Sequence, residues 1–441
     1  MKKKIIKKVA ILSLVICLGF AMLVLPTSCG EQENKAIIIL PGIMGSNIID
    51  AESGEPIWAP LPPGVKMFEL DIKKDISTIL KTPAVQKILF FDKPGGAYEW
   101  LDKMLVDPKT GKSKHHMSAQ VIDDEGNVKY PQCATYGTLE YYEKTYHYLE
   151  DNFGDEYDVR MFEYDWRLDN MTSAIALENF INDHGYTSVT FVAHSMGGIL
   201  ASTYLARSEE NRAKVDKFIP LGTPFFGSHK AVRVVDDPMS LVGSDMDDVL
   251  NTVKGAVDAV NKKGSFDTFL NKFISFARNL PTLYQLIPYE DMCKAYTECD
   301  ALNGLGIVSV DGQPIANYDE FMSFLNNKGY TNKNFVKQMI DWQREQYVKQ
   351  GDEWIHVSKL VDTRYIVGNN LPTELCVNFN AQGKQTGCTL SNLGDGTVPL
   401  YSATCGLDVT DSRVYQFEGI SHGDLSYDDK CLDKIAELIR E

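Results

Sequence analysis

Ser195 has the surroundings that a nucleophilic serine needs. An apolar, strand-like run leads into it, a helical pattern follows it, and the small residues Ala193 and Gly197 lie two positions on either side. A sharp strand-to-helix turn crowds the backbone, so small residues at these spacings allow the turn to lift the hydroxyl above the edge of a sheet. A helix that begins at the serine also adds positive potential where an oxyanion would form. The pattern predicts that Ser195 is a nucleophile.

A serine hydroxyl becomes nucleophilic when a base and an orienting acid act on it. His422 is the candidate base, because it follows the strand-like residues 414–417 and precedes a terminal helical pattern. Asp395 is the candidate acid, because glycines on both sides allow its backbone to bend and aim the carboxylate inward. A Gly-Asp-Gly segment is also typical of a surface turn, but the chain order Ser, Asp, His favours a catalytic triad. We expect His194, beside the nucleophile, to point away from the hydroxyl and to serve in packing.

Stabilisation of an oxyanion needs two backbone N–H donors. Met196 directly follows the nucleophile and is the expected first donor. The loop Pro41–Ser46 follows an early apolar run, and glycines flank Ile43 and Met44 in it. Ile43 is therefore the expected second donor, with a plain tight turn as the alternative interpretation of the loop.

The elements that must position these residues follow from the apolar pattern. Six short segments predict strands: residues 36–40, 159–164, 188–193, 218–221, 365–367 and 414–417. Four segments with helical spacing lie between or after them: residues 139–152, 173–183, 199–207 and 432–439. Continuous apolar runs suit strands that are buried on both faces. The alternation predicts an α/β fold with a mostly parallel, doubly wound sheet. Together with the Ser195 turn and the order Ser, Asp, His, it favours an α/β-hydrolase core.

Two regions interrupt this alternation. Residues 51–135 are rich in proline, glycine and charge, whereas residues 225–360 are mostly helical by pattern. Core strands flank both regions, so we interpret them as a lid insertion and a large, mainly helical cap insertion within one hydrolase domain, residues 36–441. Inside the second insertion, residues 308–315 predict a hairpin.

The first residues of the chain predict export. Five lysines precede an uncharged apolar run, residues 9–25, and this pattern is typical of a signal peptide over residues 1–28. A short transmembrane anchor is the alternative. Small residues directly before Cys29 resemble a bacterial lipoprotein processing site, which predicts lipidation of Cys29 and a membrane-anchored protein at the cell surface. Simple cleavage would instead release a secreted protein.

Charge and cysteine content limit the partners. The formal net charge is −16, which argues against nucleic acid, a partner that requires a basic surface. The sequence has no cysteine or histidine cluster with zinc spacing, so no metal is expected. Export permits disulfides, and Cys293 with Cys299 and Cys376 with Cys388 are the plausible local pairs.

A series of short motifs resembles one family. In chain order they are Pro41–Ser46, Tyr164–Arg167, Ala193–Gly198, Gly222–Ser228, Asn279–Pro288, Gly368–Thr373 and Gly394–Pro399. The ordered set is similar to that of the lecithin:cholesterol acyltransferase and lysosomal phospholipase A2 family. The resemblance implies Ser195, Asp395 and His422 as the triad and Ile43 with Met196 as the oxyanion hole. It also implies a mobile lid, a cap that receives acyl chains from a membrane surface, and catalysis without a cofactor.

Two features depart from the family's pattern. In the mammalian enzymes a disulfide-closed lid follows the oxyanion strand, but this chain has no cysteine between Cys29 and Cys133. The lysosomal branch has an acidic residue in the oxyanion loop where this chain has Ile43. Both departures leave the acyl acceptor open.

Three residues near these motifs have competing interpretations. Trp58 is either a membrane-touching part of the lid or a buried anchor for an irregular loop. Trp58 and Trp166 are candidates for contact with substrate. Arg167 either pairs with a carboxylate and so holds the lid or cap, or is simply structural, and we favour structural support.

The expected activity is hydrolysis of lipid acyl esters, as in a phospholipase or lipase, with acyl transfer to an alcohol as a further outcome. Two alternatives stay open. One is an esterase or thioesterase that acts on soluble substrates. The other is a catalytically silent surface lipoprotein that binds lipid or a protein partner.

Overall fold

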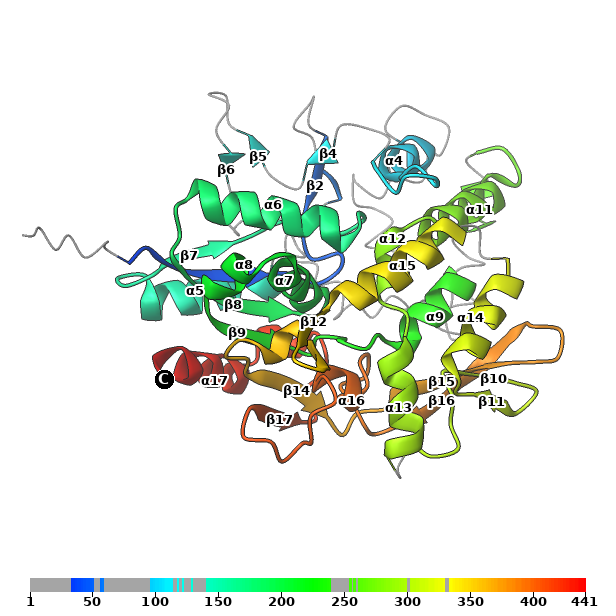
Figure 1. Ribbon diagram of the computed structural model, residues 1–441. Coiled ribbons are helices and arrows are strands. Elements are labelled where there is room, and N and C mark those ends of the chain that lie inside the picture. The colour runs from blue at the N-terminus through cyan, green and yellow to red at the C-terminus, as the bar shows by residue number, and fades with distance from the viewer. Residues whose placement is uncertain are drawn as a thin grey trace, which may run out of the picture. The chain divides into compact units, whose positions relative to one another are not determined.

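Six parallel strands form the main sheet of this computed structural model (Figure 1). The structure describes residues 33–50, 56–58, 96–113, 117–118, 121–122, 128–129, 140–238, 254–255, 257–258, 261–299, 302–329 and 333–441. The strands are, in sheet order, β17 (Val414–Glu418), β14 (Tyr365–Asn369), β9 (Val215–Leu221), β8 (Ser188–His194), β1 (Lys35–Leu40) and β7 (Asp158–Met161). They are the six segments predicted from the apolar pattern. The predicted α/β fold class, with its mostly parallel sheet, is confirmed.

Alternate residues of the central strands face two separate cores. In β1, Ala36, Ile38 and Leu40 belong to one apolar cluster, whereas Ile37 and Ile39 belong to the other. All five are at most 1% exposed, as expected for a parallel strand covered on both faces. Burial on both faces fixes the register, because a slip by one residue would exchange the two sets of side chains.

Four helices cover the two faces of the sheet (Figure 1). The first cluster includes residues of α6 (Asn170–Asp183) and α7 (Met196–Arg207), and the second includes residues of α5 (Glu140–Phe153) and α17 (Asp429–Arg440). Side-chain caps mark two of the helix starts. Asp169 accepts a hydrogen bond from Thr172 N at 3.0 Å, and Asp428 accepts one from Lys430 N at 2.9 Å.

The region before α5 contributes short elements. They are β2 (Ile48–Asp50), β3 (Pro56–Trp58), α4 (Ala97–Met104), β4 (Met117–Ser118), β5 (Val121–Ile122) and β6 (Val128–Lys129). Strands β3, β2 and β4 form one small sheet, and β5 pairs with β6. The other residues of the predicted lid, 51–135, lie outside the described residues apart from 105–113 and Gly96.

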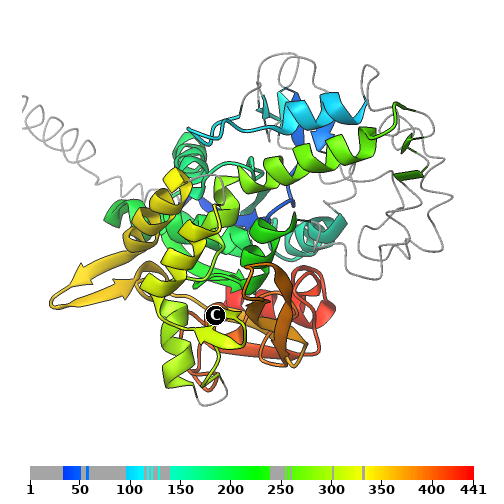
Figure 2. The ribbon, with the colours of Figure 1, turned by 90° about the vertical axis from the view of Figure 1, so that its right-hand side faces the viewer.

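Helices dominate the second insertion (Figure 2). They are α9 (His229–Asp236), α11 (Ser265–Arg278), α12 (Pro281–Gln285), α13 (Glu290–Glu298), α14 (Tyr318–Asn327) and α15 (Lys333–Glu345). The predicted hairpin at residues 308–315 is confirmed as β10 (Val308–Val310) and β11 (Gln313–Ile315). A second hairpin, β12 (Tyr347–Gln350) with β13 (Glu353–His356), projects from the helices.

One sheet of this region extends beyond residue 360. Strands β15 (Thr373–Phe379) and β16 (Gln385–Ser391) complete a four-stranded sheet in the order β11-β10-β15-β16. Neither strand was predicted from the sequence. Among the described residues, the remaining short helices are α8 (Glu209–Ala213), α16 (Leu400–Ala403), η3 (Val357–Lys359) and η4 (Asp424–Ser426).

The expected local disulfides are wrong. Cys293, Cys299, Cys376 and Cys388 all have free thiols. Cys376 pairs in register with Thr389, and its neighbour Val377 pairs with Cys388. Because successive strand residues point to opposite faces, Cys376 and Cys388 lie on opposite sides of the sheet. Cys293 and Cys299 are six positions apart along α13 and its end, which places them on different sides of the helix.

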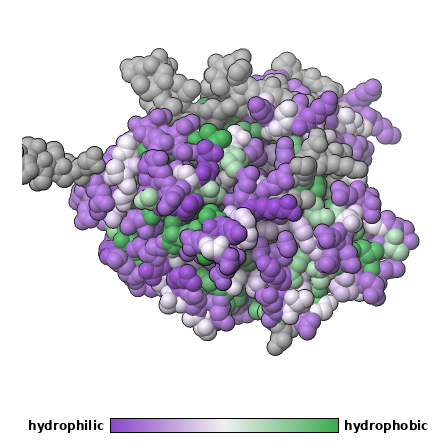
Figure 3. Space-filling model, in the orientation of Figure 1, coloured by the Kyte–Doolittle hydropathy of each residue, from purple (hydrophilic) through white to green (hydrophobic). Residues whose placement is uncertain are grey.

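The part of the chain that the structure describes has no helix that is both long and apolar enough to span a bilayer. Within the same part, no group of His, Cys, Asp and Glu side chains could hold a metal ion. The face seen in Figure 3 is mainly hydrophilic, with scattered apolar residues. The predicted signal peptide, residues 1–28, and Cys29 lie outside the described residues.

Candidate active site

Ser195 lies in the sharp turn between β8 and α7. Its φ of 54° and ψ of −123° are a strained conformation for a residue with a side chain. Its N–H donates to Leu221 O of the neighbouring strand at 2.9 Å. The small residue two positions later is required here, because a Cβ on Gly197 would lie 2.2 Å from Leu40 O. The strand-to-helix turn predicted from the sequence is therefore present.

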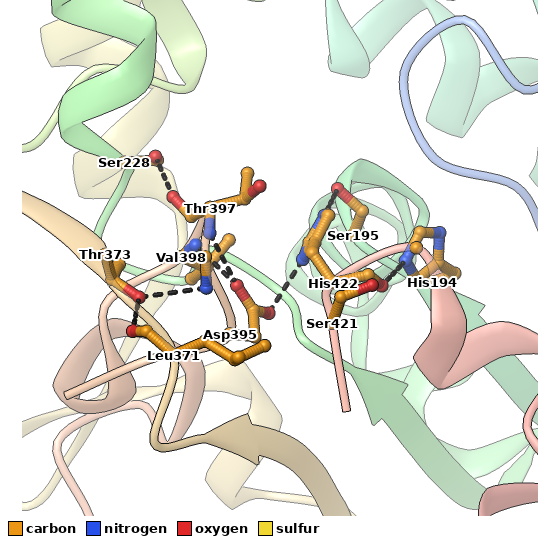
Figure 4. Close-up of polar contacts among 12 residues, drawn as sticks. His194, Ser195, Ser228, Leu371, Thr373, Asp395, Thr397, Val398, Ser421 and His422 are labelled. Atoms are coloured by element: carbon orange, nitrogen blue, oxygen red, sulfur yellow. Dashed lines mark hydrogen bonds and ion pairs between the residues drawn. The ribbon is translucent and has the colours of Figure 1, made fainter. Parts of the chain in front are cut away.

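His422 lies between Ser195 and Asp395 (Figure 4). Its Nε2 is 2.9 Å from Ser195 Oγ, and its Nδ1 is 2.7 Å from Asp395 Oδ2. A carboxylate can only accept, so Nδ1 carries the proton and Nε2 presents its lone pair to the serine hydroxyl. The structure thus brings all three predicted triad residues into one hydrogen-bonded chain.

Asp395 is held firmly in the turn that carries it. Its Oδ1 accepts hydrogen bonds from Thr397 N at 2.9 Å and Val398 N at 2.7 Å, which leaves Oδ2 for His422. The residue is 1% exposed. Its backbone O also accepts from His422 N at 2.9 Å. The Gly-Asp-Gly segment is therefore both a tight turn and the support of an inward-pointing carboxylate.

The loop that contains Ile43 packs against the nucleophile. Gly45 N donates to Gly42 O at 3.0 Å, so Gly42–Gly45 is a tight turn, and Met44 has a φ of 65°. A Cβ on Gly42 would lie 3.0 Å from Ser195 Cβ. Met196 is the first residue of α7, so its N–H has no partner within that helix. Both predicted oxyanion donors therefore lie on segments that adjoin Ser195, and their role stays a prediction.

Trp58 contacts this turn and packs against two further tryptophans. Trp58 is half-buried, and its Nε1 donates to Met44 O at 3.1 Å. Its ring meets Trp166 edge-on with centroids 5.1 Å apart, and Trp100 lies at 6.5 Å. Trp166 is 2% exposed. These contacts support the anchor interpretation of Trp58, while contact of either Trp58 or Trp166 with substrate stays a prediction.

Arg167 joins the loop after β7 to the end of α4. Its guanidinium contacts Asp165 through two bonds, of 2.9 and 2.6 Å, and its Nη1 donates to Met104 O at 2.9 Å. The Arg167 side chain is fully buried, and that of Asp165 is 10% exposed. Arg167 therefore pairs with a carboxylate and holds a helix of the predicted lid region, which matches the first of the two interpretations.

We expect Arg167→Met to lower the free energy of unfolding by about 3–5 kcal/mol, because it leaves the Asp165 carboxylate buried without its partner. Asp411 and Arg413 form a pair with the same spacing and similar bonds, but the Arg413 side chain is 36% exposed. Arg413→Met should therefore cost no more than about 1 kcal/mol. Urea denaturation of both variants measures the difference, and equal losses would contradict it.

Three neighbours of the triad were missed or misjudged from the sequence. His194 is more than a packing residue, because both of its ring nitrogens have hydrogen-bond partners, Tyr142 Oη and His422 O. Gly222 has a φ of 56°, and a Cβ there would lie 2.8 Å from Asp395 Oδ2. Lys230 Nζ lies 3.3 Å from Thr397 Oγ1, and burial lowers the pKa of Lys230. Two of them lie in the motifs described above, His194 in Ala193–Gly198 and Gly222 in Gly222–Ser228, whereas the sequence offered no signal for Lys230.

Comparisons with known proteins agree with this fold. The lecithin:cholesterol acyltransferase family model matches residues 90–253, which confirms the resemblance drawn from the short motifs. Tle4, in the crystal structure of the Tle4–Tli4 complex, is 14% identical with a TM-score of 0.52, and the match covers 93% of this chain and 99% of that chain. This likeness shows the shared fold.

A second solved structure, of the lin2722 gene products from Listeria innocua, is 10% identical with a TM-score of 0.31 and covers 93% of this chain and 95% of that chain. No curated protein matches the chain by sequence. Together, the family match and the fold support an enzyme of the esterase or lipase type.

Proposed function

Because residues 90–253 match the lecithin:cholesterol acyltransferase family, we propose that this protein is a serine hydrolase that cleaves acyl esters of lipids. The observation that carries the proposal is the chain of hydrogen bonds from Ser195 Oγ through His422 to Asp395, with distances of 2.9 and 2.7 Å. In this arrangement an imidazole can remove the serine proton while a buried carboxylate holds the ring in the required tautomer.

The reaction follows from this geometry in two stages. Ser195 Oγ attacks the ester carbonyl carbon as His422 Nε2 takes the hydroxyl proton. The N–H groups of Ile43 and Met196 stabilise the resulting oxyanion, and each donor contributes about 3–4 kcal/mol. His422 then returns the proton to the leaving alcohol, and an acyl-enzyme remains. Water, deprotonated by His422, releases the fatty acid; a second alcohol in its place would give acyl transfer.

Two features favour a lipid over a soluble ester. The family match is one. The other is the restricted exposure of the site, because Ser195 is 7% exposed and the His422 side chain is 15% exposed. Exclusion of water in this way suits an apolar acyl chain. The proposed anchor at Cys29 would keep the enzyme at a membrane surface, whereas the net charge of −16 disfavours attraction to anionic lipid.

Product analysis tests the proposal. The protein is incubated with mixed phospholipids and with esters of increasing chain length, with and without an alcohol acceptor, and products are identified by mass spectrometry. We expect long-chain esters to be cleaved at least about tenfold faster than acetyl esters, because each buried methylene adds binding energy. Activity confined to acetyl esters would support the soluble esterase instead. Lipid binding without any turnover would support the silent lipoprotein.

A further inference from the structure

A line of buried hydrogen bonds joins the Gly42–Gly45 turn to the backbone of His422. Tyr142, on α5, has its hydroxyl 2.8 Å from Gly42 N and 2.7 Å from His194 Nδ1. His194 Nε2 lies 2.8 Å from His422 O, as Figure 4 shows. Tyr142 is 5% exposed and His194 is 8% exposed. The line therefore crosses the protein interior between the two segments that flank Ser195.

The chemistry of the partners sets the direction of each bond. A carbonyl oxygen can only accept, so His194 Nε2 must donate to His422 O. Burial lowers the pKa of His194 to about 3, so the ring is neutral at neutral pH and its Nδ1 is an acceptor. Tyr142 consequently donates to Nδ1 and accepts from Gly42 N–H. With these donor and acceptor assignments, all three hydrogen bonds can form at the same time.

We propose that Tyr142 and His194 are positioning residues that hold the Gly42–Gly45 turn and the peptide of His422 in the arrangement that the reaction needs. The inference rests on the proposed function, because it takes Ile43 as an oxyanion donor and His422 as the base. The Gly42 N–H is engaged by Tyr142, so the next N–H along the turn, that of Ile43, remains for the oxyanion. The backbone of His422 is held on both sides of its Cα, since its N–H donates to Asp395 O at 2.9 Å and its carbonyl oxygen accepts from His194.

Close packing means that these parts move together. A Cβ on Gly42 would lie 3.0 Å from Ser195 Cβ and 3.2 Å from His194 Nδ1. The rings of His194 and His422 have centroids 4.9 Å apart. Loss of the hydrogen bond from Gly42 N to the Tyr142 hydroxyl would therefore displace the turn relative to Ser195. Catalysis is sensitive to displacements of this kind, whereas a merely structural polar network would affect stability alone.

Tyr142→Phe tests the proposal most specifically, because it keeps the ring and removes only the hydroxyl. Tyr148→Phe is the matched control on the same helix, where the hydroxyl donates to Asp433 Oδ1 at 2.7 Å. For Tyr142→Phe we expect kcat for a long-chain ester to fall about tenfold or more, with KM within about twofold. The rate at which a fluorophosphonate labels Ser195 should fall by a similar factor. Tyr148→Phe should leave all three quantities near the wild-type values.

Two variants of His194 add a second readout. In His194→Gln the side-chain amide can reach the position of Nε2 and donate to His422 O, whereas in His194→Asn it reaches only the position of Nδ1. We therefore expect the glutamine variant to retain more labelling activity than the asparagine variant. Melting temperatures of all four variants separate loss of folded protein from loss of rate.

The outcomes are distinguishable. Wild-type kcat and labelling in folded Tyr142→Phe would overturn the positioning inference and leave the proposed function intact. If the wild type labels at Ser195 but does not cleave lipids, the lipid proposal fails, while the labelling rates still test the positioning inference. If Ser195 in the wild type is not labelled at all, both proposals are wrong.

Discussion

Ser195→Ala is expected to lower kcat for a long-chain ester by at least about a thousandfold, because the variant lacks the hydroxyl that forms the acyl-enzyme. The change removes Oγ from the end of the hydrogen-bonded chain and leaves His422 and Asp395 in place. KM should change little, since the acyl chain would bind to the same apolar surroundings. Steady-state kinetics on purified protein measures both quantities.

Ser202→Ala is the matched control for this variant. Ser202 lies on the same helix, α7, is 1% exposed, and its Oγ has no hydrogen-bond partner in the described structure. Its removal should leave activity unchanged. Residual activity of Ser195→Ala within tenfold of the wild type would contradict a serine mechanism at this site.

Asp395→Asn is expected to reduce kcat by a factor on the order of 10³–10⁴. An asparagine can still accept from Thr397 N and Val398 N through its carbonyl oxygen, so the turn should persist. Its amide nitrogen, however, would donate to His422 Nδ1. That contact forces the proton onto Nε2, which can then no longer accept the proton of Ser195.

Asp408→Asn controls for loss of a turn carboxylate. Asp408 Oδ1 accepts from Thr410 N at 2.8 Å in an exposed turn. Its replacement should leave kcat at the wild-type value. If Asp395→Asn also kept wild-type kcat, Asp395 would be a turn residue and not part of a triad.

The core sheet was predictable because its strands carry a strong signal. Segments such as 36–40 are continuous apolar runs, and burial on both faces leaves few other ways to place them. The Ser195 turn was predictable for a related reason, since strand, small residues and helix follow one another along the chain. Asp395 and His422 are separated from Ser195 by many residues, and chain order was the link.

Other features depend on contacts that no local pattern records. Strand β16 escaped prediction because none of its residues is buried and it carries polar residues such as Thr386 and Thr389. The predicted pair of Cys376 with Cys388 was wrong because strand register decides which face each thiol occupies. The pair of Cys293 with Cys299 was wrong because the helical turn separates the two side chains. The contact from Tyr142 to His194 joins residues 52 positions apart. A sequence shows both residues, but only the packing of α5 against the end of β8 brings them together.

Labelling with alkyl fluorophosphonates of increasing chain length tests the central claim most directly. The reagent modifies a serine only where a base and oxyanion donors activate it, and the alkyl chain reports on the neighbouring site. Peptide mapping should find the phosphonyl group on Ser195, with a labelling rate that rises with chain length. Modification of another residue, no modification, or a rate that falls as the chain lengthens would contradict a lipid acyl hydrolase that acts through Ser195.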